Sequence, residues 1–241
     1  MDGEAIKQIA ELAAPTLLEV DGKQFSRDSL SLVAHDPRPE PIKAYTLTAL
    51  ADYLNSHVDD ALLEEVPYII QVDSPQRVTL RGAADGSNLK RSDFITVSPP
   101  ERKGFSFGQW FQADNFLIAL QTMFEDTPDR TYLLKLCSRI VAGKEITRED
   151  DGVTQVVTVK KGVALKESVD IRPRVDLAPF RSFNELPQPI SSFLFRVQGG
   201  DDEEPTKCAL FEADGGAWQI KAILAIRDLI KAIIPGSFVV A

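Results

Sequence analysis

The stretch Ser168-Val169-Asp170-Ile171-Arg172-Pro173-Arg174-Val175-Asp176-Leu177 alternates strictly between two sets of positions, one mainly apolar and the other mainly charged. A period of two places one set on each face of a strand. Pro173 falls among the apolar positions and has no amide hydrogen to donate, which a sheet tolerates at an edge or a bulge. We therefore predict an edge or bulged strand with one solvated face, as in antiparallel sheets.

The runs around this stretch also read as strands joined by hairpins. Lys144–Glu149 and Val153–Lys160 flank Asp150-Asp151-Gly152, whose residues suit a tight turn. A further pair is expected at Ser192–Val197 and Lys207–Ala213. Nearer the N-terminus, extended runs are expected at residues 68–72, 77–82 and 94–97.

Helices come in blocks between these strands. We expect them at residues 46–57, 113–124, from 127 to about 142, and 217–233. Thr46 is the expected N-cap of the first. Thr127-Pro128-Asp129 combine an N-cap, a proline at the first helical position and an acid near the positive end of the dipole. Blocks of strands and helices predict an α+β fold, with a mainly antiparallel sheet or sheets and about four to five helices.

The chain is expected to have three parts. Residues 1–36 form an N-terminal arm, with a helix at residues 4–13 and a hairpin around Asp21-Gly22. Residues 37–42 alternate proline with charge and form a linker. Residues 43–241 form the main α+β domain.

Composition excludes several classes of protein. The chain has 36 acidic and 27 basic residues and a formal net charge of -9, which disfavours a surface that grips duplex DNA. No uncharged run approaches the roughly 18 residues that cross a bilayer, so we expect no membrane partner. We also expect no signal peptide, because the N-terminus is acidic and lacks an apolar stretch. Cys137 and Cys208 are expected to be buried free thiols in a reducing cytosol.

We predict no catalytic residues, no metal and no cofactor. The chain has two histidines, His35 and His57, and neither has a cysteine or a second histidine at ligand spacing. No P-loop or nucleophile elbow occurs. Gly215-Gly216 precede a helix N-terminus, which attracts anions, but we expect the Asp214 carboxylate to take those amide donors as a cap.

One set of candidate ligand-binding residues combines strand arginines with an aromatic ring. Its members are Arg172, Arg174, Arg181, Arg196 and Trp218. Arginine binds phosphate through two parallel hydrogen bonds, and an indole can stack on a base. In the competing interpretation, Asp170 and Asp176 neutralise the first two arginines and Trp218 anchors the last helix. The sequence leaves both interpretations open.

A second candidate set lies between Arg77 and Phe111. Six basic and three acidic residues leave this segment at +3 and the remaining chain at -12. Basic strands with interleaved aromatic residues can bind single-stranded nucleic acid, although such aromatics more often belong to the core. The candidates are Arg77, Arg81, Lys90, Arg91 and Lys103.

The expected last helix is apolar around most of its surface. Ile220, Ile223, Leu224, Ile230 and Ile233 lie on it. Such a helix is buried in its own domain or against a partner. We expect a homo-oligomer.

Several motifs resemble an uncharacterised family of phage and prophage proteins from Gram-positive bacteria. They include Asp150-Asp151-Gly152-Val153-Thr154-Gln155, Leu177-Ala178-Pro179-Phe180-Arg181-Ser182-Phe183 and Ala209-Leu210-Phe211-Glu212-Ala213-Asp214-Gly215-Gly216-Ala217-Trp218. The chain is also distantly similar to the YfdQ-like prophage family. The resemblance covers about residues 45–233. It implies a phage protein in the cytoplasm of the infected bacterial host, and it carries over no catalytic residue.

These observations favour three functions, in order. The first is a non-enzymatic binding protein that counters bacterial defence by binding a small nucleotide signal or a host defence protein. The second is an accessory protein of phage replication or recombination that binds single-stranded nucleic acid. The third is a phage structural or assembly protein.

Overall fold

The computed structural model describes residues 3–5, 7–8, 17–20, 23–26, 40–60, 63, 67–84, 91–141, 145–150, 155–161, 165–199 and 205–241. The fold is α+β with mostly antiparallel sheets, as the sequence predicts. The chain divides into two compact units, Met1–Arg38 and Pro39–Ala241.

The smaller unit contains an antiparallel hairpin of β1 (Leu17–Val20) and β2 (Lys23–Ser26). These bounds confirm the predicted hairpin, while its turn, Asp21-Gly22, lies outside the described residues. Residues 3–5 and 7–8 are helical, and the rest of the helix predicted at 4–13 also lies outside them.

The larger unit contains a five-stranded sheet of order β14-β4-β5-β6-β3. Its strands are β3 (Ile42–Ala44), β4 (Tyr68–Ser74), β5 (Arg77–Gly82), β6 (Asp93–Val97) and β14 (Val239–Val240). The three central strands are antiparallel, and the two short edge strands pair in parallel. β3 therefore includes Ile42, the last residue of the predicted linker.

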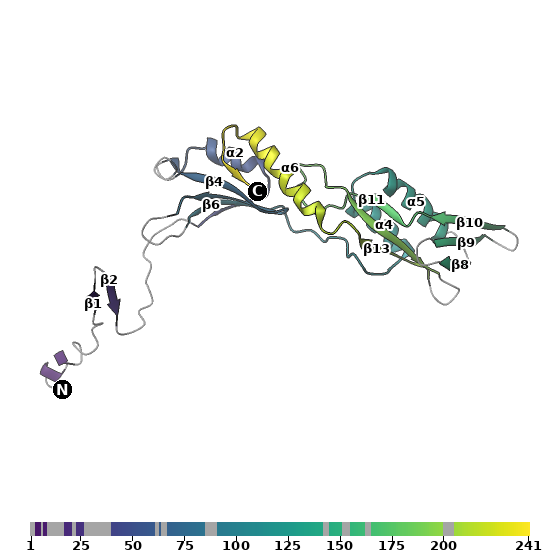
Figure 1. Cartoon of the computed structure of the whole chain (residues 1–241), viewed down its shortest axis with the longest axis horizontal. Helices are drawn as coiled ribbons and strands as arrows, with labels where there is room; N and C mark the ends of the chain where they lie inside the picture. Colours follow the sequence, from purple (N-terminus) through teal and green to yellow (C-terminus); the bar gives the residue numbers. More distant parts are fainter. Residues whose placement is uncertain are drawn as a thin grey trace. The chain divides into compact units, whose positions relative to one another are not determined.

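Helices α2 (Thr48–Asn55) and α6 (Ala217–Ile233) cover one face of this sheet (Figure 1). Leu50 of α2 and Ile226 of α6 are fully buried against it. The apolar core residues of the three central strands lie on the face under the helices, although Thr79 on the opposite face is also fully buried. These core residues are Ile70, Val72, Val78, Leu80, Ile95 and Val97.

The N-terminus of α2 is capped differently from the prediction. Thr46 makes no capping bond, and the helix begins at Thr48. Instead, the Glu185 carboxylate accepts hydrogen bonds from the amides of Leu47 (2.6 Å) and Thr48 (3.0 Å). A carboxylate suits this end because it meets both free amide donors and the positive end of the helix dipole.

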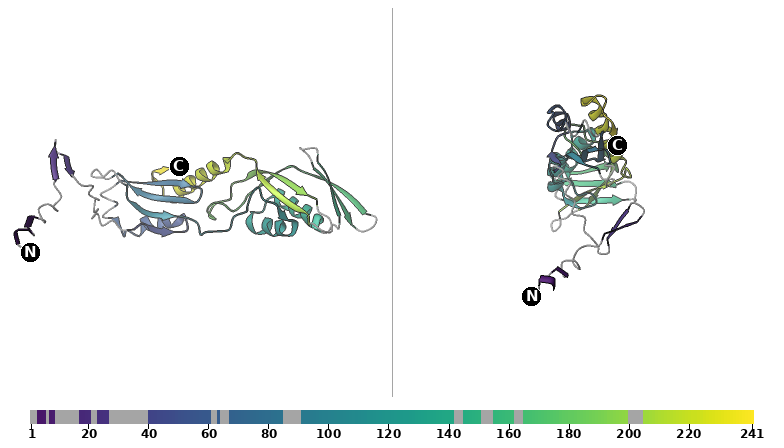
Figure 2. Two further views of the ribbon diagram at one scale, coloured as in Figure 1. Left: turned by 90° about the horizontal axis from the view of Figure 1, so that it is seen from below. Right: turned by 90° about the vertical axis from the view of Figure 1, so that its left-hand side faces the viewer.

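A second sheet in the larger unit has the order β11-β12-β13-β7. Its strands are β11 (Arg174–Leu177), β12 (Ser191–Gln198), β13 (Lys207–Glu212) and β7 (Phe111–Gln112). Helices α4 (Ala113–Met123) and α5 (Pro128–Val141) pack on one side of it (Figure 2). As predicted, the Thr127 hydroxyl caps α5 by accepting the Arg130 amide hydrogen bond at 3.1 Å.

The two cysteines meet in this second core. Cys137 on α5 and Cys208 on β13 are free and fully buried, as expected. A hydrogen bond between the two thiols, together with burial, raises the pKa of Cys137 well above its usual range.

The alternating stretch at residues 168–177 forms parts of two strands. β10 (Leu165–Ile171) ends before Arg172-Pro173, and β11 follows. β10 is an edge of the antiparallel sheet β10-β9-β8, with β9 at Gln155–Lys161 and β8 at Glu145–Asp150. β11 is an edge of the four-stranded sheet. Both the edge position and the interruption at the proline agree with the prediction.

Residues 178–190, here called the connector, join β11 to β12 and contact both cores. Phe183 is fully buried in the core of the five-stranded sheet. The Ser182 hydroxyl donates to the Pro75 carbonyl at 2.8 Å, and the Gln76 amide donates to the Arg181 carbonyl at 3.1 Å. Gln188, itself buried, accepts the amide hydrogens of Arg181 and Ser182. The connector is thus an ordered part of the fold.

The last helix is less buried than its composition predicts. Ala222, Ile226 and Ile230 face the core, whereas Ile220 is 60% exposed and Leu224 is 39% exposed. The oligomer expected from this helix stays a prediction. Within the described ranges, no helix has both the length and the apolar character that a membrane span requires.

Candidate ligand-binding site

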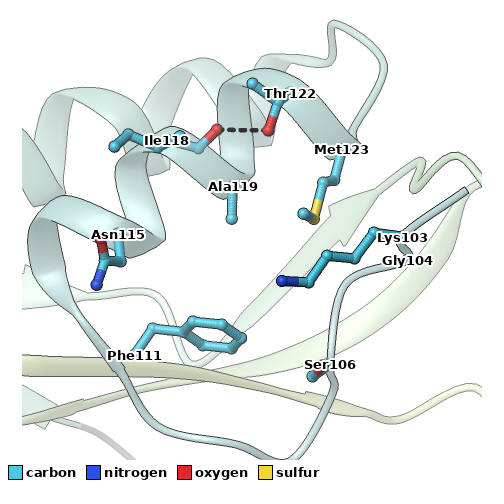
Figure 3. Close-up of a pocket in the computed structure, with 9 residues that line it drawn as sticks. All are labelled: Lys103, Gly104, Ser106, Phe111, Asn115, Ile118, Ala119, Thr122 and Met123. Carbon is cyan, nitrogen blue, oxygen red and sulfur yellow. Dashed lines mark hydrogen bonds between the residues drawn. The ribbon is translucent and has the colours of Figure 1, made fainter.

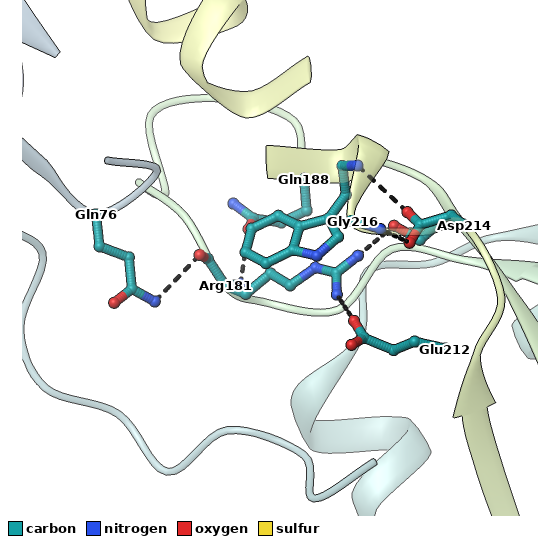
Figure 4. A network of polar contacts seen from close by, with 8 residues as sticks. Gln76, Arg181, Gln188, Glu212, Asp214 and Gly216 are labelled. Carbon is teal, nitrogen blue, oxygen red and sulfur yellow. Dashed lines mark hydrogen bonds and ion pairs between the residues drawn. The ribbon is translucent and has the colours of Figure 1, made fainter. Parts of the chain in front are cut away.

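Two of the predicted ligand-binding residues, Arg181 and Trp218, meet in the structure. The guanidinium carbon of Arg181 lies 3.8 Å from the centre of the Trp218 ring. Its Nη1 atom forms a 2.6 Å ion pair with Glu212, and Nη2 donates to the Ser191 hydroxyl (Figure 4). Its Nε atom is buried without a hydrogen-bond partner among the described residues. The arginine side chain is 10% exposed, and the chain itself engages both of its terminal nitrogens.

The helix N-terminus beside this pair is also occupied. The Asp214 carboxylate accepts hydrogen bonds from the amides of Gly216 (3.0 Å) and Trp218 (3.3 Å), which confirms the predicted cap. Burial raises the pKa of Asp214, but the bonds from Gly216, Ser191 and Trp218 and the charge of Arg181 outweigh it, so that the pKa is lowered. The two glycines therefore present no free anion cradle.

The other three predicted arginines do not join Arg181 and Trp218. Arg172 pairs with Asp129 of α5 at 3.0 Å and lies over the Tyr132 ring. Arg174 is on the solvated face of β11, where Val175 and Leu177 point into the core instead. Arg196 lies on the corresponding face of β12, half-buried and opposite Ala209. These five residues therefore do not line one pocket.

The second predicted set is likewise divided. Arg81 is held between Asp73 (3.2 Å) and Asp93 (3.1 Å), which neutralise it. Arg91 donates to the Gly82 carbonyl at 3.4 Å, and Lys90 lies outside the described residues. Arg77 is on β5, while Lys103 lies beside α4. The described members of this set are therefore not gathered at one site.

Lys103 reaches into a pocket between α4 and the start of β7 (Figure 3). The cavity measures about 290 Å³ and its walls are mainly apolar. It is lined by Lys103, Gly104, Ser106, Phe111, Asn115, Ile118, Ala119, Thr122 and Met123. This volume is just below the range for small-molecule sites, which begins at about 300 Å³.

The local sequence explains why this pocket forms. Asn115, Ile118, Ala119 and Thr122 recur at spacings of three and four residues, so they share one face of α4. Their helix starts two residues after Phe111, and the aromatic ring lies under that face (Figure 3).

The loop that carries Lys103 is held on both sides of it. Arg102 donates to the Asn184 side chain (2.7 Å) and to the Ser182 carbonyl (2.8 Å) in the connector. Phe105 is 9% exposed and packs against Phe111 and Phe124. Lys103 is therefore presented to the pocket from a short segment between two anchors.

The pocket offers one cation and an apolar wall. In the part of the chain that the structure describes, Lys103 has no hydrogen bond or ion pair. An ammonium group beside apolar walls attracts an anionic group whose remainder is apolar or aromatic. The Asn115 amide and the Ser106 hydroxyl are polar groups at the same cavity. The described ranges contain no cluster of three His, Cys, Asp or Glu side chains suited to a metal ion.

Sequence reasoning found Lys103 but not its surroundings. Phe111, Asn115 and Met123 were not candidates, because only the packing of α4 over β7 brings them to the lysine. Ile118 is 59% exposed, and this exposure of an apolar side chain is seen only in the packed structure.

No protein-family model, curated protein or solved structure matches the chain. The resemblance to prophage proteins therefore stays a prediction.

Proposed function

We propose that this is a phage-encoded, non-enzymatic binding protein that takes a small anionic ligand in the Lys103 pocket. The proposed ligand class is a nucleotide that signals in bacterial defence. The observation that carries the proposal is an ammonium group, unpaired with any residue that the structure describes, at an apolar cavity with an aromatic wall. A nucleotide combines the matching groups, because its phosphate pairs with a cation and its base packs on an aromatic side chain.

The small size of the ligand and the phage setting are supported by the chain's net charge and by its resemblance to prophage proteins. A net charge of -9 disfavours duplex binding but does not oppose a site for one small anion. The resemblance to phage proteins supports a place in the cytoplasm of the infected host. Binding without turnover would lower the free concentration of a signal, which is one way for a phage to counter defence.

Thermal-shift and calorimetric titration against cyclic nucleotides and ADP-ribose derivatives tests the proposal. We expect at least one compound to stabilise the protein, since a ligand that binds only the folded state raises the unfolding temperature. Lys103→Ala should weaken that ligand about tenfold through loss of the ion pair. Lys231→Ala, on the exposed side of α6, is the matched control and should bind as the wild type does.

If none of these compounds raised the unfolding temperature, the nucleotide ligand would be rejected. Equal binding by wild type and Lys103→Ala would reject the pocket. A phage lacking the gene should plate less efficiently on hosts with nucleotide-signalled defence than on hosts without it, and equal plating would reject the biological role.

A further inference from the structure

The face of the five-stranded sheet opposite α2 and α6 holds a second and larger groove. It measures about 630 Å³, roughly twice the volume of the Lys103 pocket, and is mainly lined by strands β3 and β6 and their flanks. The lining residues are Glu40, Pro41, Lys43, Ala44, Tyr45, Arg77, Asp93, Thr96, Ser98 and Pro99.

Strand register shows which side chains face this groove. Lys43 lies opposite Thr96, and Thr96 lies opposite Thr79, so the three share one sheet face. The neighbouring residues Val78 and Val97 point to the other face, into the core under the helices. The groove is therefore the polar side of the sheet.

The groove has two cations that the chain itself does not neutralise well. The Lys43 side chain has no hydrogen bond or ion pair to any described residue. Arg77 is 55% exposed, and its Nε atom reaches Asp73 only at 4.0 Å. The nearby Arg81 shows the contrast, because two carboxylates hold it at close range and use its charge.

An exposed aromatic ring stands beside these cations. Tyr45 follows β3 directly and is 64% exposed. An exposed tyrosine offers a flat surface on which an unpaired base can stack, and such stacking tolerates any base. Thr96 and Ser98 add hydroxyl groups that can donate to phosphate or sugar oxygens.

We infer that this groove binds single-stranded nucleic acid, with backbone phosphates at Lys43 and Arg77 and a base on Tyr45. A duplex does not fit this arrangement, because its bases are stacked on each other and its charge density calls for more cations than two. The inference is independent of the proposed function, since it involves another sheet and none of the residues of the Lys103 pocket.

Two acidic residues line the groove, Glu40 and Asp93. Asp93 is paired with Arg81 at 3.1 Å, so Glu40 provides the sharper test. Glu40 lines the groove, is exposed and has no ion pair with any described residue. Its charge repels phosphate. Glu40→Gln should therefore strengthen binding, whereas a groove that binds no anion would show no effect of this change.

Fluorescence anisotropy with a labelled oligo-thymidylate of about 15 nucleotides, within the site sizes of single-strand binders, tests the inference at low and moderate salt. Tyr45→Ala should weaken binding about tenfold, and Tyr45→Phe should retain it, because the ring rather than the hydroxyl stacks. The double variant Lys43→Ala/Arg77→Ala should lower the slope of log affinity against log salt by about 1.4, or about 0.7 per lost phosphate contact. Lys231→Ala should leave both affinity and slope unchanged.

The inference would be overturned if the wild type did not bind at low salt, or if a duplex of the same length bound with equal affinity. It would also be overturned if Tyr45→Ala and the double variant Lys43→Ala/Arg77→Ala bound as well as the wild type. Loss of oligonucleotide binding in Lys103→Ala, with the groove variants unaffected, would also overturn it by moving the site to the pocket. A nucleotide that still binds through Lys103 would leave the proposed function intact in each case.

Discussion

The guanidinium group of Arg181 lies against the indole ring of Trp218, 3.8 Å from its centre, and joins the connector to the first turn of α6. The same arginine pairs with Glu212 at the end of β13. Burial disfavours the charged guanidinium group and lowers the pKa of Arg181. The half-buried Trp218 indole and the Glu212 carboxylate offset this effect, because both attract the cation. The contact is structural, since it fixes a helix and a loop to one sheet.

Replacing Arg181 should destabilise the protein strongly. Arg181→Ala removes the ion pair and the cation over Trp218, so we expect a loss of about 3 kcal/mol in the free energy of unfolding. Arg181→Lys should recover only part of this, because lysine lacks the planar group that serves Glu212, Ser191 and Trp218 together. Urea unfolding followed by circular dichroism measures both.

Arg227 provides the matched control for Arg181. It pairs with the adjacent Asp228 on the surface of α6. Arg227→Ala should cost under about 1 kcal/mol, as exposed pairs do. Equal losses for the two arginines would contradict a structural role of the Trp218 contact.

Removing the Glu185 cap of α2 should lower the free energy of unfolding by a measurable amount. Glu185→Ala leaves the amides of Leu47 and Thr48 without their acceptor, and we expect a loss of about 1 kcal/mol. Thr46→Ala should change stability by less than half of that, because Thr46 does not cap the helix. Chemical unfolding of both variants decides between the two caps, and a larger effect at Thr46 would reject the capping by Glu185.

The carboxylate of Asp214 should make the free energy of unfolding depend on pH. Its pKa is lowered in the folded protein, so its contribution is present above the unfolded pKa of about 3.9 and is lost as the pH falls through the folded value. Asp214→Asn should therefore be less stable than wild type at pH 7, and the gap should narrow as the pH falls below about 4. A gap that stays constant from pH 7 to pH 3 would show that Asp214 is not responsible.

The two thiols should be unreactive in the folded protein. Cys137 and Cys208 are fully buried, and the raised pKa of Cys137 keeps it protonated, whereas the thiolate is the reactive form. We expect an aromatic disulfide reagent to label both thiols at once in urea and far more slowly in buffer. Rapid labelling of either thiol without denaturant would contradict the packing of α5 on β13.

Local patterns were sufficient for most elements. Strict alternation predicted β11, and the turn residues around Asp21-Gly22 predicted a hairpin with the observed strand bounds. Thr127-Pro128-Asp129 predicted the start of α5, because a cap depends on residues within one turn of each other. The cap of α2 was not predictable in this way, since its acceptor lies 138 positions away from Leu47 along the chain.

The candidate sites depended still more on the tertiary structure. The sequence around a basic residue does not show whether carboxylates pair with it, as they do with Arg81, or whether it has no partner among the described residues, as for Lys103. The carboxylates that pair with Arg81, Arg172 and Arg181 lie on other elements, so only the packing of those elements decides which arginines are neutralised. Phe111 and Met123 likewise line the Lys103 pocket only because of how α4 packs over β7.

The sequence by itself determined the α+β class, the bounds of most helices and strands, and a negative charge unsuited to duplex DNA. These follow from periodicity, turn chemistry and counting, which act over a few residues or over the whole composition. Only the tertiary structure decided that Arg181 and Trp218 hold the fold together, and that Lys103, Lys43 and Tyr45 face cavities. Such roles depend on long-range neighbours, because the availability of a side chain is set by what packs against it.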